Sequence, residues 1–183
     1  SNIMTNSNYK LNIKSIKCFN KISDSILNSI EKESKIVKYK IGDSITQQDI
    51  IPNKIFLILS GEVRLTTNRS TKTKTIAKLN SGSFIGLASF LRANPCESTS
   101  AMNDVLVLSF PDKLILDIYE NDLHFRNWCN TNIQPIEAYE LFKFLFDKNE
   151  KTNFKSQKKQ LEKSISVEVI NNGEIIKTDQ DTL

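Results

Sequence analysis

The residues best suited to chemistry lie between Phe84 and Thr99, where a glycine and a short apolar run precede a proline and several polar side chains. Gly86 can form a tight turn, and Leu87 to Leu91 can form one short helix after it. Backbone N–H groups at the start of a helix bind anions such as phosphate. The segment therefore has the layout of a phosphate-binding cassette, in which the loop at Pro95 leads into a strand.

Patterns typical of catalysis or metal binding are missing from the chain. His124 is the single histidine, and neither a serine elbow nor a paired acid motif accompanies it. The three cysteines, Cys18, Cys96 and Cys129, are widely spaced and form no C-x-x-C pair. We expect no enzyme, no metal site and no cofactor. We also expect reduced thiols in the cytoplasm, with His124 at the surface or packed on a helix.

Four side chains of the cassette each allow two interpretations. Arg92 either turns inward to hold an anion or faces solvent at the end of the short helix, where the helix dipole favours it. Ser98 and Thr99 either donate hydrogen bonds to a ligand or serve only as strand residues. Cys96 is a reactive thiol at the pocket mouth or a structural one, and the sequence favours the structural role.

Short strands separated by turns must position this segment. Apolar and alternating runs predict strands at residues 36–39, 55–59, 62–66, 75–79 and 105–108, with turns at 41–44, 60–61 and 80–82 and a loop at 68–73. The run from Ile55 to Leu59 is apolar throughout, which predicts a strand covered on both faces. The spacing favours a β-roll or barrel with helical ends.

Helices are predicted on both sides of the strands. Residues 4–32 suggest an amphipathic helical entry with a cap near Ser23, and further helices are expected from Pro111, over 123–129 and from Pro135. The last helix is apolar on more than one face, so it should pack on the β-body and on a second surface. Aromatic residues there should pack the helical end or form a subunit contact; they are Trp128, Phe142, Phe144 and Phe146.

Composition and local patterns divide the chain. A net charge of +4 spread along the 183 residues favours a solvated surface over a nucleic-acid footprint, and the apolar runs are too short to cross a bilayer. The predicted parts are an expression scar (1–3), N-terminal helices (4–34), a β-roll (35–110), C-terminal helices (111–147) and a tail (148–183). Within the tail, residues 148–163 read as a linker. The rest reads as a hairpin that could open a following domain.

Three runs give the chain a family resemblance. Gly42 to Ile45, Ile55 to Val63, and Gly82 with Phe84 to Gly86 resemble the cyclic nucleotide-binding domain over about residues 20–130. The resemblance implies an α+β fold, a jelly-roll-like β-roll (double-stranded β-helix) with flanking helices. It also implies that the cassette N–H groups bind a cyclic phosphate, that a glutamate after the glycine accepts the ribose hydroxyl, and that an arginine after the proline pairs with the phosphate.

Placed on this chain, the resemblance puts Leu87 at the glutamate position and Cys96 at the arginine position, and Glu97 adds a negative charge beside them. Asp49 and Pro52 stand where turn glycines are common. We therefore expect a degenerate cassette that does not bind cAMP or cGMP tightly, with a cyclic nucleotide or another small molecule as candidate ligand. The expected ligand-binding set is Phe84, Gly86, Leu87, Ala88, Ser89, Cys96, Glu97, Ser98 and Thr99.

A narrower similarity covers Leu91 to Glu97, which resembles the N-terminal regulatory domain of bacterial ABC exporters of the bacteriocin or haemolysin type. It implies a non-catalytic regulatory domain at the cytoplasmic face of the membrane, with the rest of an exporter chain as partner and no nucleic acid bound to these residues. A homodimer through residues 134–147 is also expected. The alternatives are the sensor domain of a catabolite-activator-type transcription regulator and a working cAMP or cGMP module.

Overall fold

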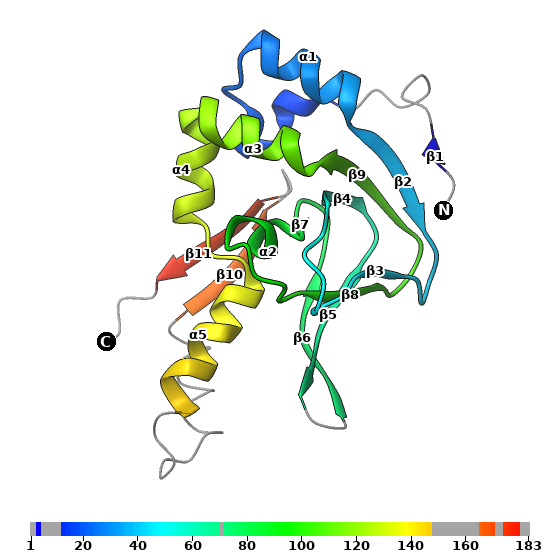
Figure 1. Ribbon diagram of the computed structural model, residues 1–183, viewed down its shortest axis with the longest axis vertical. Helices are drawn as coiled ribbons and strands as arrows, with labels where there is room; N and C mark the ends of the chain where they lie inside the picture. The colour runs from blue at the N-terminus through cyan, green and yellow to red at the C-terminus, as the bar shows by residue number, and fades with distance from the viewer. Residues whose placement is uncertain (1–2, 5–11, 70–71, 148–164, 171–173, 180–183) are drawn as a thin grey trace.

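The computed structural model describes residues 3–4, 12–69, 72–147, 165–170 and 174–179. Two antiparallel sheets form a β-roll, and helices from both ends of the chain pack beside it (Figure 1). One sheet has the strand order β1-β2-β9-β4-β7, and the other has the order β3-β8-β5-β6. The predicted α+β fold, a β-roll with flanking helices, is confirmed.

The strands of the roll are short and come from the whole length of the domain. They are β1 (Ile3–Met4), β2 (Lys35–Tyr39), β3 (Ser44–Thr46), β4 (Lys54–Ser60), β5 (Val63–Arg69), β6 (Lys72–Leu79), β7 (Phe84–Ile85), β8 (Ser98–Ala101) and β9 (Val105–Pro111).

Strand β4 is the clearest case of sequence dictating structure, because its two faces pack into two different cores. Ile55 and Leu57 belong to a core between the roll and the helices, whereas Phe56 and Ile58 belong to the core inside the roll. Side chains alternate across a strand, so a strand covered on both sides needs apolar residues at every position. The predicted two-sided burial is confirmed.

Three boundaries differ from the sequence prediction. The predicted loop at 68–73 is mostly strand, because Asn68 pairs with Thr73 and Arg69 with Lys72 through backbone contacts that do not depend on apolar side chains. Strand β3 was not predicted, and the turn predicted at 41–44 ends at its first residue. Its three residues are too few to show an alternating pattern, and it is held by pairing with β8. Strand β9 continues to Pro111, so the helix after it begins one residue later than predicted.

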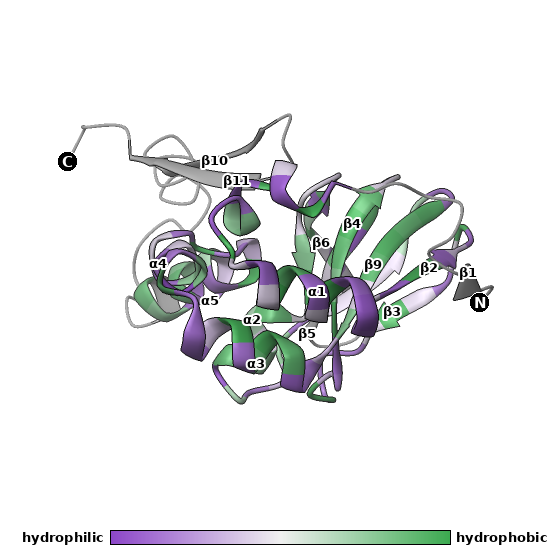
Figure 2. Cartoon of the chain, turned by 90° about the horizontal axis from the view of Figure 1, so that it is seen from above, coloured by the Kyte–Doolittle hydropathy of each residue, from purple (hydrophilic) through white to green (hydrophobic). Residues whose placement is uncertain are grey.

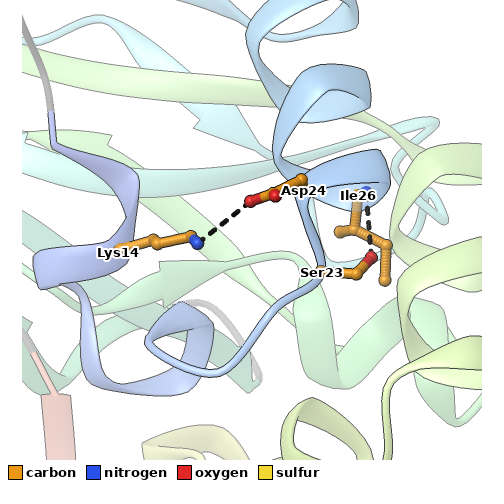
Figure 3. Close-up of polar contacts among 4 residues, drawn as sticks. All are labelled: Lys14, Ser23, Asp24 and Ile26. Atoms are coloured by element: carbon orange, nitrogen blue, oxygen red, sulfur yellow. Dashed lines mark hydrogen bonds and ion pairs between the residues drawn. The ribbon is translucent and has the colours of Figure 1, made fainter.

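The N-terminal segment is less helical than predicted. Two short 3-10 turns, η2 (Ile13–Ser15) and η3 (Lys17–Phe19), precede one helix, α1 (Asp24–Glu33). The hydroxyl of Ser23 accepts a hydrogen bond from the N–H of Ile26 at 3.2 Å and caps this helix, as predicted (Figure 3). An exposed ion pair between Lys14 and Asp24 at 3.3 Å joins the turn η2 to the start of the helix (Figure 3).

The other helices are α2 (Leu87–Leu91), α3 (Asp112–Asn121), α4 (Leu123–Thr131) and α5 (Pro135–Asp147). Helices α1, α3 and α4 turn apolar residues toward the roll and polar residues outward (Figure 2). Helix α5 packs Ile136 and Tyr139 against the core inside the roll. Among the described residues, no helix is long and apolar enough to cross a membrane.

The end of the chain contains the predicted hairpin. Strands β10 (Ile165–Ile170) and β11 (Glu174–Asp179) pair antiparallel, with Val167 opposite Lys177. The predicted linker at 148–163 lies outside the described residues.

Candidate functional site

Gly86 sets the geometry of the cassette. It lies in the left-handed region at φ +85° and immediately precedes α2. A Cβ atom at this position would lie 2.9 Å from Cγ of Pro52 and 3.5 Å from the carbonyl oxygen of Lys54. Both the backbone angle and the close approach of Pro52 therefore require glycine. Pro52, which stands where the resemblance expects a turn glycine, packs directly on the cassette.

The carboxylate of Glu97 fills the start of the cassette helix. Its Oε2 atom accepts a hydrogen bond from the N–H of Gly86 at 2.9 Å. Its Oε1 atom accepts hydrogen bonds from the N–H and the hydroxyl of Ser89, both at 3.2 Å. Glu97 is only 5% exposed. An acidic side chain of the protein thus satisfies the N–H groups that an anionic ligand would need.

Burial raises the pKa of the Glu97 carboxyl above its usual range, and the nearby Glu137 carboxylate adds to that increase. The hydrogen bonds from Gly86 and Ser89 oppose the increase because they stabilise the charged form. Burial is the larger effect, so the pKa is raised in spite of the hydrogen bonds that Gly86 and Ser89 donate to the carboxyl oxygens.

Cys96 lies beside this network as a neutral thiol. Its Sγ is 3.2 Å from the Ser89 hydroxyl, and its N–H donates to the same hydroxyl oxygen at 3.4 Å. Burial raises the thiol pKa, so Cys96 carries no charge near pH 7. All three cysteines of the chain are free thiols, and burial with the nearby Glu137 raises the pKa of Cys129 to about 12. The structural role predicted for Cys96 fits this environment better than a reactive one.

Besides Cys96, three members of the predicted ligand-binding set pack in the core. Phe84 and Leu87 pack in the core between the roll and the helices, and Ala88 packs inside the roll. Leu87 is 1% exposed. The position that the resemblance assigns to a ribose-binding glutamate is thus occupied by a core leucine.

The two strand residues after the cassette differ in their contacts. The buried Thr99 hydroxyl lies 2.7 Å from the Thr46 hydroxyl and accepts a hydrogen bond from the N–H of Thr46 at 3.2 Å. This pair joins β8 to β3 across 53 positions of sequence, which favours a structural role for Thr99. Ser98 is half-buried, and its carbonyl accepts a hydrogen bond from Thr66.

Arg92 points away from the cassette core. Its guanidinium lies 3.8 Å from the Glu140 carboxylate on α5, and 39% of its side chain is exposed. An open groove of about 470 Å³ lies here, between the end of α2 and the outer face of α5. The groove residues are Arg92, Glu137, Glu140, Leu141 and Phe144. Of the two interpretations of Arg92, the structure shows the outward one.

The remaining candidates from the sequence lie in the helical end. A ring nitrogen of His124 is 2.9 Å from the carbonyl oxygen of Lys17, so His124 packs α4 on the N-terminal turns, as predicted. Trp128 stacks on Phe125 and contacts Phe84. No cluster of acidic, histidine or cysteine side chains within the described part of the chain could hold a metal ion.

Sequence reasoning missed several contacts that shape the site. Pro52, Thr46 and Ile136 lie more than 30 positions from their partners in the cassette or in β8, so no local pattern could reveal these contacts. The sequence places Glu97 near the site as a charge that repels an anion. In the structure its carboxyl group instead accepts hydrogen bonds from the N–H groups of Gly86 and Ser89, and this contact depends on the path of the loop through Pro95.

The fold combines a roll of two sheets, a short helix that begins after the turn at Gly86, and further helices on both sides of the roll. This is the fold of cyclic nucleotide-binding-like β-rolls. The family model of the cyclic nucleotide-binding domain matches residues 36–122. This segment of the chain is therefore similar in sequence to that domain. No curated protein sequence matches the chain.

Several solved structures share the fold. A protein from Geobacter metallireducens, assigned to the cyclic nucleotide-binding proteins, is 19% identical at a TM-score of 0.54; the match covers 62% of this chain and 86% of that one. The catabolite activator protein of Thermus thermophilus is 19% identical at a TM-score of 0.50; the match covers 81% of this chain and 65% of that one.

A third similar structure is a cAMP-independent protein kinase A regulatory subunit from Trypanosoma brucei, 12% identical at a TM-score of 0.51. The match covers 64% of this chain and 48% of that one. That protein is a triple variant, with a glutamate and a valine changed to alanine and a threonine changed to arginine, and it is bound to cAMP. The chain spans less than two thirds of both the kinase subunit and the activator protein.

Proposed function

We propose that this domain is a non-catalytic regulatory module whose cassette does not bind cAMP or cGMP tightly. The observation that carries the proposal concerns the two positions that would bind the ribose and the phosphate of a nucleotide. Both are occupied by buried, uncharged side chains. Leu87 is 1% exposed in the core, and Cys96 is 8% exposed with a raised pKa. Neither side chain can accept a ribose hydroxyl or pair with a phosphate.

The expected loss of affinity follows from these two positions. A hydrogen bond to a charged group contributes about 1.5–3 kcal/mol, so two missing bonds weaken binding by about 3–6 kcal/mol. At about 1.4 kcal/mol for each tenfold change, this is roughly two to four orders of magnitude in the dissociation constant.

Calorimetric titration of the chain with cAMP and with cGMP tests the proposal. We expect no saturable heat in the micromolar range of either nucleotide. Micromolar binding of either one would overturn the proposal and favour the alternative of a working nucleotide sensor.

We further propose that the domain is the N-terminal regulatory part of an ABC exporter. The support is the resemblance of Leu91 to Glu97 to the cassettes of such proteins. The alternative is the sensor of a transcription regulator, which the fold shared with the catabolite activator protein keeps open. The sequence of the gene beyond codon 183 distinguishes them: membrane spans and a Walker A loop support the exporter, and a helix-turn-helix supports the regulator.

A homodimer through residues 134–147 is also proposed. The support is the outer face of α5, where Leu141, Phe144 and Leu145 are 47%, 57% and 46% exposed. Light scattering during size-exclusion chromatography tests it. We expect a dimer for the wild-type chain and a monomer for Phe144→Glu, with the exposed Leu116→Glu on α3 as a matched control. A monomeric wild-type chain would refute this interface.

A further inference from the structure

We infer that Glu97 is an internal ligand of the cassette: its carboxylate occupies the place of an anionic ligand and keeps the cassette closed without one. This inference deepens the proposed function and rests on it. It goes further because a cassette that merely lacks its binding side chains would be empty, whereas this one is filled by the protein.

The first support is the way in which the carboxylate is held. Its two oxygens face separate donors, Oε2 facing the N–H of Gly86 and Oε1 facing the N–H and hydroxyl of Ser89. Three donors thus converge on one anionic group from the turn and the first turn of α2. A bound phosphate and the Glu97 carboxylate would need the same N–H groups, so they cannot occupy the cassette together.

The second support is that the charge is buried without a cation in its hydrogen-bond network. Glu97 is 5% exposed, and the described partners of its oxygens are Gly86 and Ser89. The nearby Arg92 is turned toward Glu140 on α5. An acidic side chain is rarely buried unless its charge is compensated, so the converging N–H groups supply the compensation.

The third support is the link from the cassette to α5. Cys96, the neighbour of Glu97, packs in the core inside the roll together with Ile136 of α5. Ile136 is only 2% exposed, so the start of α5 is seated against the roll while Glu97 fills the cassette. The arrangement therefore needs no bound nucleotide to hold α5 in place.

Amide resonances of Gly86 and Ser89 in ¹H–¹⁵N NMR spectra test the inference, with inorganic phosphate as the probe and chloride at equal ionic strength as the reference. The proteins are wild type, Glu97→Ala and, as a control, Glu62→Ala, which removes an exposed carboxylate. In wild type and in Glu62→Ala, we expect the chemical shifts of both amides to stay the same when phosphate is added. In Glu97→Ala they should move upfield before phosphate is added and then shift saturably with phosphate.

Two results would overturn the inference. One is a saturable response of the wild-type Gly86 and Ser89 amides to phosphate. The other is a Glu97→Ala protein in which both amides keep their wild-type positions. If Glu97→Ala does not fold, Glu97→Gln serves instead, since it keeps the shape but loses one acceptor oxygen. At least one of the two amides must then exchange with solvent tenfold faster or more, and unchanged exchange at both refutes the inference.

The outcomes separate the two proposals. Micromolar cAMP binding by the wild-type chain would defeat the proposed function. A wild-type chain that does not bind cAMP, together with an unresponsive Glu97→Ala cassette, would defeat only the internal-ligand inference.

Discussion

Replacing Glu97 by alanine should destabilise the domain, because the substitution leaves buried donors without an acceptor. The N–H groups of Gly86 and Ser89 would both lose their partner. An unsatisfied buried donor costs about 1–3 kcal/mol, which gives about 2–6 kcal/mol for the two. Removing a desolvated carboxylate offsets part of this cost, so we expect a net loss of about 2–4 kcal/mol at pH 7.

Urea denaturation followed by fluorescence of Trp128 measures this loss, because Trp128 packs in the core between the roll and the helices. For a chain of this size, each kcal/mol of lost stability lowers Tm by about 2–4 °C, so the Tm of Glu97→Ala should be roughly 5–15 °C below that of wild type. Glu62→Ala should change the midpoint by less than about 0.5 kcal/mol. A Glu97→Ala protein as stable as wild type would refute the reasoning, since the carboxylate would then contribute nothing to folding.

The same carboxylate predicts a pH dependence with a defined sign. Burial raises the folded-state pKa of Glu97 above its ordinary value of 4.5. The part of its contribution to stability that depends on pH is therefore fully present below that ordinary value and is lost as pH rises through the raised pKa. Between these two pKa values, the free energy of unfolding of wild type should fall with pH relative to Glu97→Gln. A difference between the two proteins that is constant from pH 4 to pH 8 would contradict the predicted shift.

Two further substitutions test the cassette. Gly86→Ala should lower stability by about 2–3 kcal/mol, since it forces a left-handed alanine against Pro52, and a melting temperature equal to wild type would contradict this geometry. The double substitution Cys96→Arg with Glu97→Ala should strengthen cAMP binding by roughly ten- to a hundredfold, the range expected for one arginine–phosphate pair, when measured by calorimetry. Unchanged affinity would show that the arginine position has been assigned to the wrong residue.

Much of the fold could be predicted because local patterns carry it. Ile55 to Leu59 is apolar at every position, and β4 is indeed buried on both faces. Ser23 caps α1, and Pro135 begins α5, as their side chains favour. Strand β3 could not be predicted, because its pairing with β8 is set by residues more than 50 positions away.

The candidate site could be located from the sequence, but its internal contacts could not. Gly86 and the short helix after it were recognisable from residue type and spacing. The path of the loop through Pro95 decides whether Glu97 repels a ligand or replaces one, and no pattern in the sequence encodes that path. Leu87 is buried in the core between the roll and the helices, and this burial likewise depends on how α2 lies between the two cores.

Titration of the wild-type chain with cAMP, observed at the amide resonances of Gly86 and Ser89, tests the central claim most directly. Both amides already donate to Glu97, so we predict that neither resonance moves as cAMP is added through the micromolar range. A saturable shift of both resonances would show that a nucleotide displaces the carboxylate and would contradict the claim.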